Sequence, residues 1–555
     1  MSHRIWLFLT GLLAVLLLTA CSTTNAPSGS DVQITLQAQF EKRLLGPSGF
    51  GATVTRPARY CWAELRDVSS GALLASDYLG SGGTGTVLVP RGLSIYVQVF
   101  AQYQVPSADP NGFFMRGSVK DSPLQSSFPT ADAFAAVPVW SVTSDVVQAN
   151  QDGTLRVTAL TSNRIAGAFN IADQAVSFAA AVRDMDGSST LRLPDLHTFW
   201  TTSTNPGDQT RTYPALTKGP GNTILVSRNG GRALFSHGVY GLAGGANTET
   251  DEWDDGVLQE TFARLLFADG SYKADGSSPL SLLRRDNDNT WVDRTVQSES
   301  TAAFVAGFSD FLSAAIRNDS RILDSYVGST GTPLVDVFDL ADHTFVPVVD
   351  KGPFTRGSVA VSLWGLWKQA LGGAPAGLNT LWAAVRSSTA LADGTGEYEQ
   401  ATLGCFPSYL LGIQSRVTPT TWTSALNELA LESIPAPAPA YFAGTALWQT
   451  RPVGFSEAGS LQTYASSFYY DRNQSQAYRF THPGGARTIS MTPTSGQDFY
   501  LELIGPGGLV DWSYAAPGST RILTEPALPA GVYVARVRAG ATTATGMNTY
   551  TISVN

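Results

Sequence analysis

The sequence has few charged residues, few histidines and few cysteines, and each shortage excludes a class of protein. Charged residues make up 15% of the 555 residues, and the net charge is −9. A nucleic-acid-binding protein needs a surplus of basic side chains to neutralise phosphates, so we predict no nucleic-acid partner. The 5 histidines and 3 cysteines show no zinc-knuckle spacing.

Glycine and proline, by contrast, are plentiful. The chain contains 54 glycines and 30 prolines, and 43% of its residues are hydrophobic. This composition is too apolar for general disorder and is typical of a loop-rich secreted protein that contains β-sheet. A chain of this length is expected to form several domains rather than one core.

The first 20 residues have the features of a secretory signal peptide. "MSHR" supplies positive charge, and the apolar run that follows is shorter than a membrane-spanning helix needs. "LTAC", ending at Cys21, resembles the lipobox of bacterial lipoproteins. The resemblance implies cleavage before Cys21, a lipid such as palmitate on its sulfur, and acylation of the new amino terminus. An ordinary signal peptide or a spanning anchor is the alternative.

Residues 21–31 read as a flexible tether that joins this anchor to the folded protein. The resemblance implies a cell-envelope protein attached to a membrane by its lipid. Ser22 stands where an aspartate would signal retention in the inner membrane. We therefore expect the outer membrane or the cell surface.

Short β-rich runs separated by turns predict a β-sandwich over residues 32–120. Its sequence resembles the transthyretin-like or Ig-like sandwiches of secreted bacterial proteins. Residues 121–164 form a transition segment. Cys61 in this sandwich and Cys405 further along lie in different predicted domains, so two buried free thiols are favoured over a disulfide.

The end of the chain returns to strands after a Pro-Ala linker at residues 433–453. Residues 454–555 alternate apolar and polar side chains, which predicts a second β-sandwich. "LPAGVYVARV", followed by the closing "YTISV", resembles the pre-peptidase C-terminal jelly-roll domain of secreted bacterial peptidases. The resemblance implies a domain that accompanies a peptidase.

A mainly helical α+β domain is predicted over residues 165–432, because apolar residues recur there at helical spacing. The expected helices include residues 168–185, 254–267, 300–318 and 357–371. "GAFNIADQAVSFAA", "NTETDEWDDGVLQE", "AAFVAGFSDFLSAA" and "GSVAVSLWGLW", taken in order, resemble the gluzincin-type zinc metallopeptidases. The whole chain is thus expected to be multidomain, with a metallopeptidase-like domain between two β-sandwiches.

The resemblance assigns a role to four positions of the zinc site. Gln259 stands at the first histidine of the His-Glu-x-x-His motif, Glu260 at the general base and Ala263 at the second histidine. Ala306 stands at the third ligand. Zinc needs three such ligands to polarise a water molecule, so we predict no catalytic residue, no metal ligand and no zinc.

Glu260 has a structural explanation, because Arg264 lies four residues later and can pair with it along a helix. The rival hypothesis is a hydrolase or peptidase with a rearranged centre, for example Glu260 with His237. Structural calcium is a further alternative. Its candidate ligands lie in two acidic runs, at residues 249–255 and at Asp286, Asp288 and Asp293.

These observations favour a non-catalytic relative of the metallopeptidases that is anchored to the cell envelope. Its expected work is to bind a peptide, an envelope polymer or a protein partner in the former catalytic cleft. A cell-surface scaffold in which both sandwiches do the binding is the remaining alternative.

Overall fold

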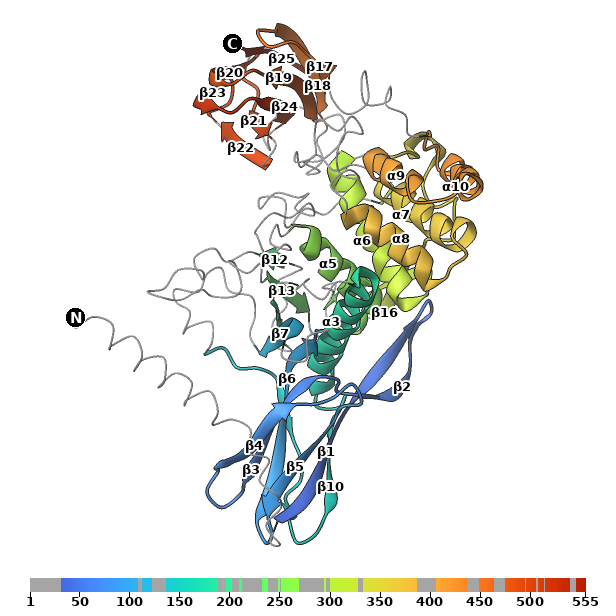
Figure 1. The fold of residues 1–555 in the computed structure, drawn as a ribbon, viewed down its shortest axis with the longest axis vertical. Helices are drawn as coiled ribbons and strands as arrows, with labels where there is room; N and C mark the ends of the chain where they lie inside the picture. The colour runs from blue at the N-terminus through green and yellow to red at the C-terminus, as the bar shows by residue number, and fades with distance from the viewer. Residues whose placement is uncertain are drawn as a thin grey trace, which may run out of the picture.

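The structure is a computed structural model (Figure 1). It describes residues 31–107, 112–121, 136–187, 193, 195–201, 209–211, 232–237, 248–249, 251–268, 294–295, 300–327, 333–386, 406–436, 449–463, 475–494, 496–505, 508–513, 515–539 and 546–555. Cys21 and Cys405 lie outside the described residues. So do Asp286, Asp288 and Asp293, which were considered as calcium ligands.

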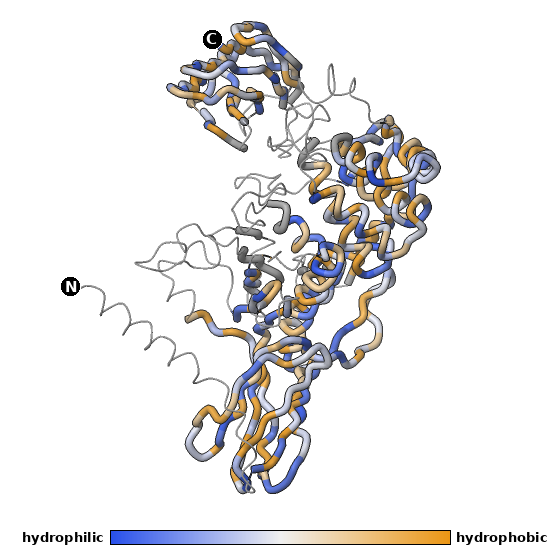
Figure 2. The backbone as a smooth tube through the Cα atoms, in the orientation of Figure 1, coloured by the Kyte–Doolittle hydropathy of each residue, from blue (hydrophilic) through white to orange (hydrophobic). Residues whose placement is uncertain are grey.

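The N-terminal region begins with a sheet built around one long strand, β1 (Asp31–Gly46). Residues of β1 alternate between the core and the outside, because successive side chains of a strand point to opposite faces. Figure 2 shows this alternation as changing colour along the N-terminal strands. The strands that pair with β1 are β2 (Gly49–Pro57) and β5 (Thr84–Pro90), both antiparallel, and β10 (Gly153–Ala159), which is parallel.

The second N-terminal sheet has the order β12-β13-β11-β7-β6-β3-β4, with β8 and β9 also paired to β6. It continues across the boundary expected at residue 120, since β7 pairs with β11. Strands β8 to β10 belong to the segment expected to be a transition. The bounds are β3 (Cys61–Asp67), β4 (Leu73–Tyr78), β6 (Ser94–Pro106), β7 (Phe113–Asp121), β8 (Ser141–Thr143), β9 (Val147–Gln148), β11 (Leu196–Thr201), β12 (Gln209–Arg211) and β13 (Arg232–His237).

Helix α3 (Ile165–Asp186) joins the sheets to the helical region, and it packs against β6, β7 and β1. It is the one described helix that is long and apolar enough to cross a membrane. However, 72% of its apolar window is buried inside the protein, so we interpret it as a core helix. The same apolar core continues from the N-terminal strands into the helices.

In the helical region, α6 (Ser300–Arg317) packs against both α5 (Asp255–Ala268) and α7 (Arg356–Gly365). These helices begin within two residues of the starts expected from hydrophobic spacing. A π-helical segment, Leu366–Ala370, continues α7. The other elements are β14 (Thr248–Glu249), the 3-10 turn Asp251–Trp253, β15 (Arg321–Val327), β16 (Pro333–Asp339), the 3-10 turn Val348–Asp350, α8 (Pro375–Arg386), α9 (Phe406–Gln414) and α10 (Pro419–Leu431).

The C-terminal strands form two sheets around a separate apolar core. One sheet has the order β17-β19-β24-β21-β22, and the other has the order β18-β25-β20-β23. This is a β-sandwich with its own hydrophobic centre. The bounds are β17 (Gln449–Thr450), β18 (Ser456–Thr463), β19 (Ser475–His482), β20 (Gly485–Pro493), β21 (Phe499–Gly505), β22 (Gly508–Ser513), β23 (Arg521–Leu528), β24 (Gly531–Ala539) and β25 (Gly546–Val554).

Candidate functional site

The four positions of the expected zinc site lie on two helices that pack together. Gln259, Glu260 and Ala263 are on α5, and Ala306 is on α6. Their exposed fractions are 1%, 4%, 0% and 2%, respectively. All four positions are therefore buried rather than arranged along an open groove.

Glu260 is held by two guanidinium groups. Arg264 lies 3.3 Å from its Oε1 along α5, which is the pair expected from the sequence. Arg356, at the start of α7, donates from Nη2 to the same oxygen at 3.1 Å. Both of these contacts of the Glu260 carboxylate are therefore made by arginines of the protein itself.

Arg356 also binds a second buried carboxylate, Asp310 on α6. Its Nε donates to Oδ2 at 2.6 Å and its Nη2 donates to Oδ1 at 2.8 Å, a two-pronged contact. Arg294 donates to Oδ1 at 3.4 Å. Burial alone raises the pKa of Asp310, but the facing Arg356 and Arg294 outweigh burial and hold that pKa below its usual value. We call Glu260, Arg264, Arg294, Asp310 and Arg356 the arginine network.

Two glycines allow close contacts around this network: Gly307 lets α6 approach α7, and Gly357 of α7 lies against the backbone of Arg294. A Cβ atom at Gly307 would stand 2.6 Å from the carbonyl oxygen of Arg356 and 2.7 Å from Cβ of Val359. Gly357 donates its N–H to the carbonyl oxygen of Arg294 at 2.9 Å, and a Cβ atom there would stand 2.4 Å from that oxygen. The seam between the helices leaves no room for larger side chains.

Gln259 faces helix α3 instead of a metal. Its Nε2 donates to Oε1 of Gln174 at 2.7 Å, and both residues are buried. Its own Oε1 has no hydrogen-bond partner among the described residues. One amide oxygen of this kind is a weak zinc donor, since zinc prefers imidazole, thiolate and carboxylate.

The donor set at these positions does not fit zinc. Ala263 and Ala306 have no donor atoms, and the Glu260 carboxylate is occupied by Arg264 and Arg356. Within the described ranges, no group of three or more His, Cys, Asp or Glu side chains could hold a metal ion. His237 ends β13, where its backbone pairs with Thr201, but its side chain lies outside the described residues.

The acidic segment before α5 uses its carboxylates within the fold. Asp254 is fully buried and accepts hydrogen bonds from the N–H and the hydroxyl of Ser325, each at 2.6 Å. Burial raises the pKa of Asp254 well above its usual value, although the Ser325 bonds oppose this shift. Asp255 pairs with Lys42 of β1. These contacts occupy two carboxylates that were considered for calcium.

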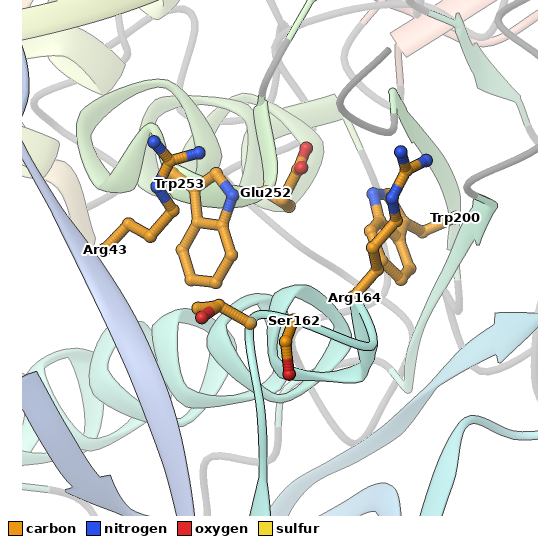
Figure 3. Close-up of a pocket in the computed structure, with 7 residues that line it drawn as sticks. Arg43, Ser162, Arg164, Trp200, Glu252 and Trp253 are labelled. Carbon is orange, nitrogen blue, oxygen red and sulfur yellow. The ribbon is translucent and has the colours of Figure 1, made fainter. Parts of the chain in front are cut away.

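A separate pocket of about 270 Å³ lies where β1, the loop before α3, β11 and the 3-10 turn before α5 meet (Figure 3). We call it the Arg-Trp pocket. It is lined by Arg43, Thr161, Ser162, Arg164, Trp200, Glu252 and Trp253. Glu252 and Trp253 belong to the acidic run at residues 249–255. The other residues are scattered along the chain and form no motif.

The walls of the Arg-Trp pocket are fixed by contacts outside it. Glu41 accepts hydrogen bonds from the N–H of Thr161 at 2.7 Å and from its hydroxyl at 2.8 Å. Arg43 is two residues from Glu41 on β1, and its guanidinium lies 4.2 Å from the ring centre of Phe50. These contacts hold the loop and the guanidinium in place.

Cys61 is a buried free thiol, and burial raises its pKa. A thiol with a raised pKa is a poor nucleophile because little thiolate forms at neutral pH. The sulfur of Cys61 therefore packs in the core of the N-terminal sheets and is not a reactive group.

No protein-family model and no curated protein matches this sequence. The chain is similar to the pre-peptidase C-terminal domain of collagenase from Bacillus anthracis, with 16% identity and a TM-score of 0.16, over 19% of this chain and 92% of that chain. It is also similar to PliG from Aeromonas hydrophila, a periplasmic inhibitor of g-type lysozyme. The identity is 15% and the TM-score is 0.14, over 19% of this chain and 96% of that chain. A mutant of PliG from Escherichia coli is similar with 20% identity and a TM-score of 0.13, over 20% of this chain and 99% of that chain.

Proposed function

We propose that this protein is a lipid-anchored binding protein of the bacterial cell envelope, with a metallopeptidase-like domain that does not catalyse. In this proposal Cys21 carries the lipid, and the anchor lies in the outer membrane or at the cell surface. A transthyretin-like or Ig-like sandwich precedes the metallopeptidase-like domain, and a pre-peptidase C-terminal-like sandwich follows it. The ligand is a peptide, an envelope polymer or a partner protein.

The arginine network carries the proposal that catalysis is absent. A metallopeptidase needs its glutamate free to take a proton from a metal-bound water. Here Glu260 is 4% exposed and faces Arg264 and Arg356. A buried cation thus compensates the negative charge that a metal would otherwise balance, and the helices pack without an ion.

Zinc content and peptidase activity test this proposal directly. We expect purified protein, dialysed against zinc and then desalted, to contain far less than one zinc per chain and to cleave no peptide in a broad fluorogenic library. Glu260→Gln is the matched variant because it keeps the shape and removes the charge. Stoichiometric zinc, with cleavage lost in Glu260→Gln, would establish the rival hydrolase.

The lipid anchor is tested independently by Cys21→Ser. We expect the unaltered protein to incorporate labelled palmitate and to sediment with membranes, because acyl chains partition into the bilayer. Cys21→Ser should incorporate no label and lose membrane attachment. Equal sedimentation of both forms without label would contradict lipidation and favour a spanning anchor.

The scaffold alternative is separated by removing residues 454–555, whose core is distinct from that of the remaining chain. Binding that belongs to the N-terminal and helical regions should survive this deletion. Loss of all ligand binding would instead assign the binding to the C-terminal sandwich.

A further inference from the structure

Large apolar side chains are exposed at one end of the N-terminal sheets. They lie in or beside the β3–β4 turn, the end of β5 and the start of β9. Their exposed fractions are 42%, 49%, 46%, 56% and 37% for Val68, Leu73, Leu88, Val146 and Val147, respectively. Single exposed apolar residues are common on protein surfaces, so their shared position, rather than their number, calls for an explanation. We call these five residues the apolar tip.

Backbone contacts bring the segments of the apolar tip together. The N–H of Val68, in the β3–β4 turn, donates to the carbonyl oxygen of Ser94 at 2.9 Å. Val147 of β9 pairs with Ile95, the next residue of β6. Leu73 begins β4 at the far side of the same turn. The start of β6 therefore lies between the β3–β4 turn and β9.

The first described strand begins at this same end. Asp31, the first residue of β1, pairs with Pro90, the last residue of β5. The N–H of Gln33 donates to Oδ1 of Asp152, in the loop between β9 and β10, at 2.7 Å. Figure 1 shows these turns at the lower end of the view, away from the helices. The chain thus enters the folded protein beside the apolar tip.

The length of chain before β1 limits how far the apolar tip can lie from a lipid on Cys21. Asp31 lies ten residues after Cys21, and ten residues span at most about 35 Å. A flexible chain of this length has a typical end-to-end distance of about 18 Å. Gly46, at the other end of the 16-residue strand β1, lies about 50 Å from its start. The tether therefore holds the apolar tip closer to the bilayer than the far end of β1.

The charges around the apolar tip favour an uncharged lipid surface. Asp145 and Asp152 are exposed in the turns at this end, and Asp31 is half-buried. The exposed cation in these turns, among the described residues, is Arg91. Three carboxylates beside one guanidinium group give no attraction to anionic lipids, so apolar contact has to supply the binding free energy.

We propose that the apolar tip contacts the surface of a bilayer of uncharged, zwitterionic lipid, with its valine and leucine side chains in the interfacial layer. This inference rests on the proposed lipid anchor and adds a second, weaker contact. The contact determines which end of the protein faces the membrane. The helical region then lies on the side away from the bilayer, because the helices pack beyond the opposite ends of these strands.

An environment-sensitive fluorescent amino acid in place of Val146 tests the inference. The full chain is purified from membranes and reconstituted into phosphatidylcholine vesicles. We expect emission at shorter wavelength than in the protein without vesicles, and quenching by nitroxide-labelled lipid, because the side chain leaves water for the interface. The matched control carries the same amino acid in place of Val348, which is 80% exposed but lies in the helical region. It should show neither effect.

A charge at the apolar tip should remove the contact. With the fluorescent amino acid in place of Leu73, Val146→Asp should lower the ratio of lipid-contacting to free protein about tenfold or more, the cost of withdrawing one valine from an apolar surface. Val348→Asp should change this ratio less than about twofold. Equal effects of the two substitutions would overturn the inference.

Lipid composition tests the charge argument. Vesicles that contain phosphatidylglycerol should give a smaller wavelength shift at residue 146 at low salt, because anionic lipid repels the carboxylates around the apolar tip. A larger shift on these vesicles would overturn the preference for an uncharged surface.

Palmitate incorporation separates failure of this inference from failure of the proposed function. A palmitate-labelled protein whose residue 146 stays in water would overturn the contact and leave the lipid anchor standing. A lipid-contacting residue 146 in protein without palmitate would support the contact and contradict the lipid anchor. Equal shifts at residues 146 and 348 would also overturn the contact, because the apolar tip would then have no preference over the helical region.

Discussion

The arginine network and the Arg-Trp pocket are built from similar groups, but they serve opposite purposes. In the arginine network, Arg356 meets Glu260 and Asp310 within 3.1 Å and has a side chain only 3% exposed. In the Arg-Trp pocket, Arg43 and Arg164 line a cavity of about 270 Å³. The first set of charges is packed between helices, whereas the second set lines a cavity.

The difference shows that the positions expected for a metal site are filled by packed side chains, whereas the cavity lies elsewhere. Helix α6 packs against both α5 and α7, and Gly307 lets its backbone approach α7, so the expected metal positions are buried. The pocket forms instead where four elements from distant parts of the chain meet: β1, the loop before α3, β11 and the 3-10 turn before α5. Elements that end at a common point leave space that helices packed along their sides do not.

Replacement of Arg356 should have the largest effect on the free energy of unfolding. Arg356→Met leaves Glu260 and Asp310 buried without their shared cation, and breaking such a pair costs about 3–5 kcal/mol of unfolding free energy. Denaturant unfolding measures this loss. Arg356→Lys keeps the charge but loses the two-pronged contact, so it should fall between Arg356→Met and the unaltered protein.

The matched control for Arg356 is Arg321→Met. Arg321 also pairs with an aspartate, Asp319 at 3.0 Å, but the two side chains are 43% and 36% exposed. Exposed pairs contribute less than about 1 kcal/mol, so the control should lose little stability. Equal losses in the two variants would mean that burial of the arginine network is unimportant.

Overpacking the contact between α6 and α7 should have the next largest effect on the free energy of unfolding. Gly307→Ala places a methyl group 2.6 Å from the carbonyl oxygen of Arg356, so the helices must separate. Overpacking of this kind costs about 1–3 kcal/mol, against a gain of up to about 1 kcal/mol from alanine's helix propensity. Gly153→Ala is the control, because its nearest neighbour would be 3.9 Å away. A more stable Gly307→Ala protein would contradict the tight seam.

The buried aspartates beside the two sites should depend on pH in opposite ways. The pKa of Asp310 is lowered, so its stabilisation is present above the unfolded pKa, about 3.9, and is lost as pH falls below it. The pKa of Asp254 is raised, so the folded state loses stability as pH rises from about 3.9 through the raised pKa.

Asp310→Asn and Asp254→Asn isolate these two contributions. As pH rises from about 2 to about 5, the unaltered protein should gain stability relative to Asp310→Asn. As pH rises from about 4 to about 7, it should lose stability relative to Asp254→Asn. Denaturant midpoints measure both differences. If both stability differences changed in the same direction with pH, the contrast between Asp310, which faces arginines, and Asp254, whose pKa is set by burial, would be wrong.

The smallest effect concerns the loop of the Arg-Trp pocket. Thr161→Val removes one hydrogen bond to Glu41 but keeps the bond from the Thr161 N–H, so we expect a loss of about 1 kcal/mol. The same change at Thr380, whose hydroxyl bonds within its own helix to Ala376, should have little effect. Equal losses in the two variants would mean that the bond from the Thr161 hydroxyl to Glu41 does not stabilise the loop.

The sequence predicted local structure well and the three-dimensional sites poorly. Hydrophobic spacing gave helices close to the observed α3, α5, α6 and α7, because that spacing determines which face a helix buries. The Glu260–Arg264 pair also followed from spacing alone, since residues four apart share one helical face. Arg356 was missed because it lies 96 residues from Glu260, and no local pattern links them.

The amino-acid sequence alone determined which side-chain chemistry was available: the side chains of Ala263 and Ala306 have no atoms that could bind a metal, whatever the fold. Only the tertiary structure decided how the remaining charges are used. It placed Arg356 against Glu260 and Asp310, and it brought Arg43 to the same cavity as Glu252. The reason is that side-chain identity limits bonding locally, whereas pairing between distant charges depends on how helices and strands pack.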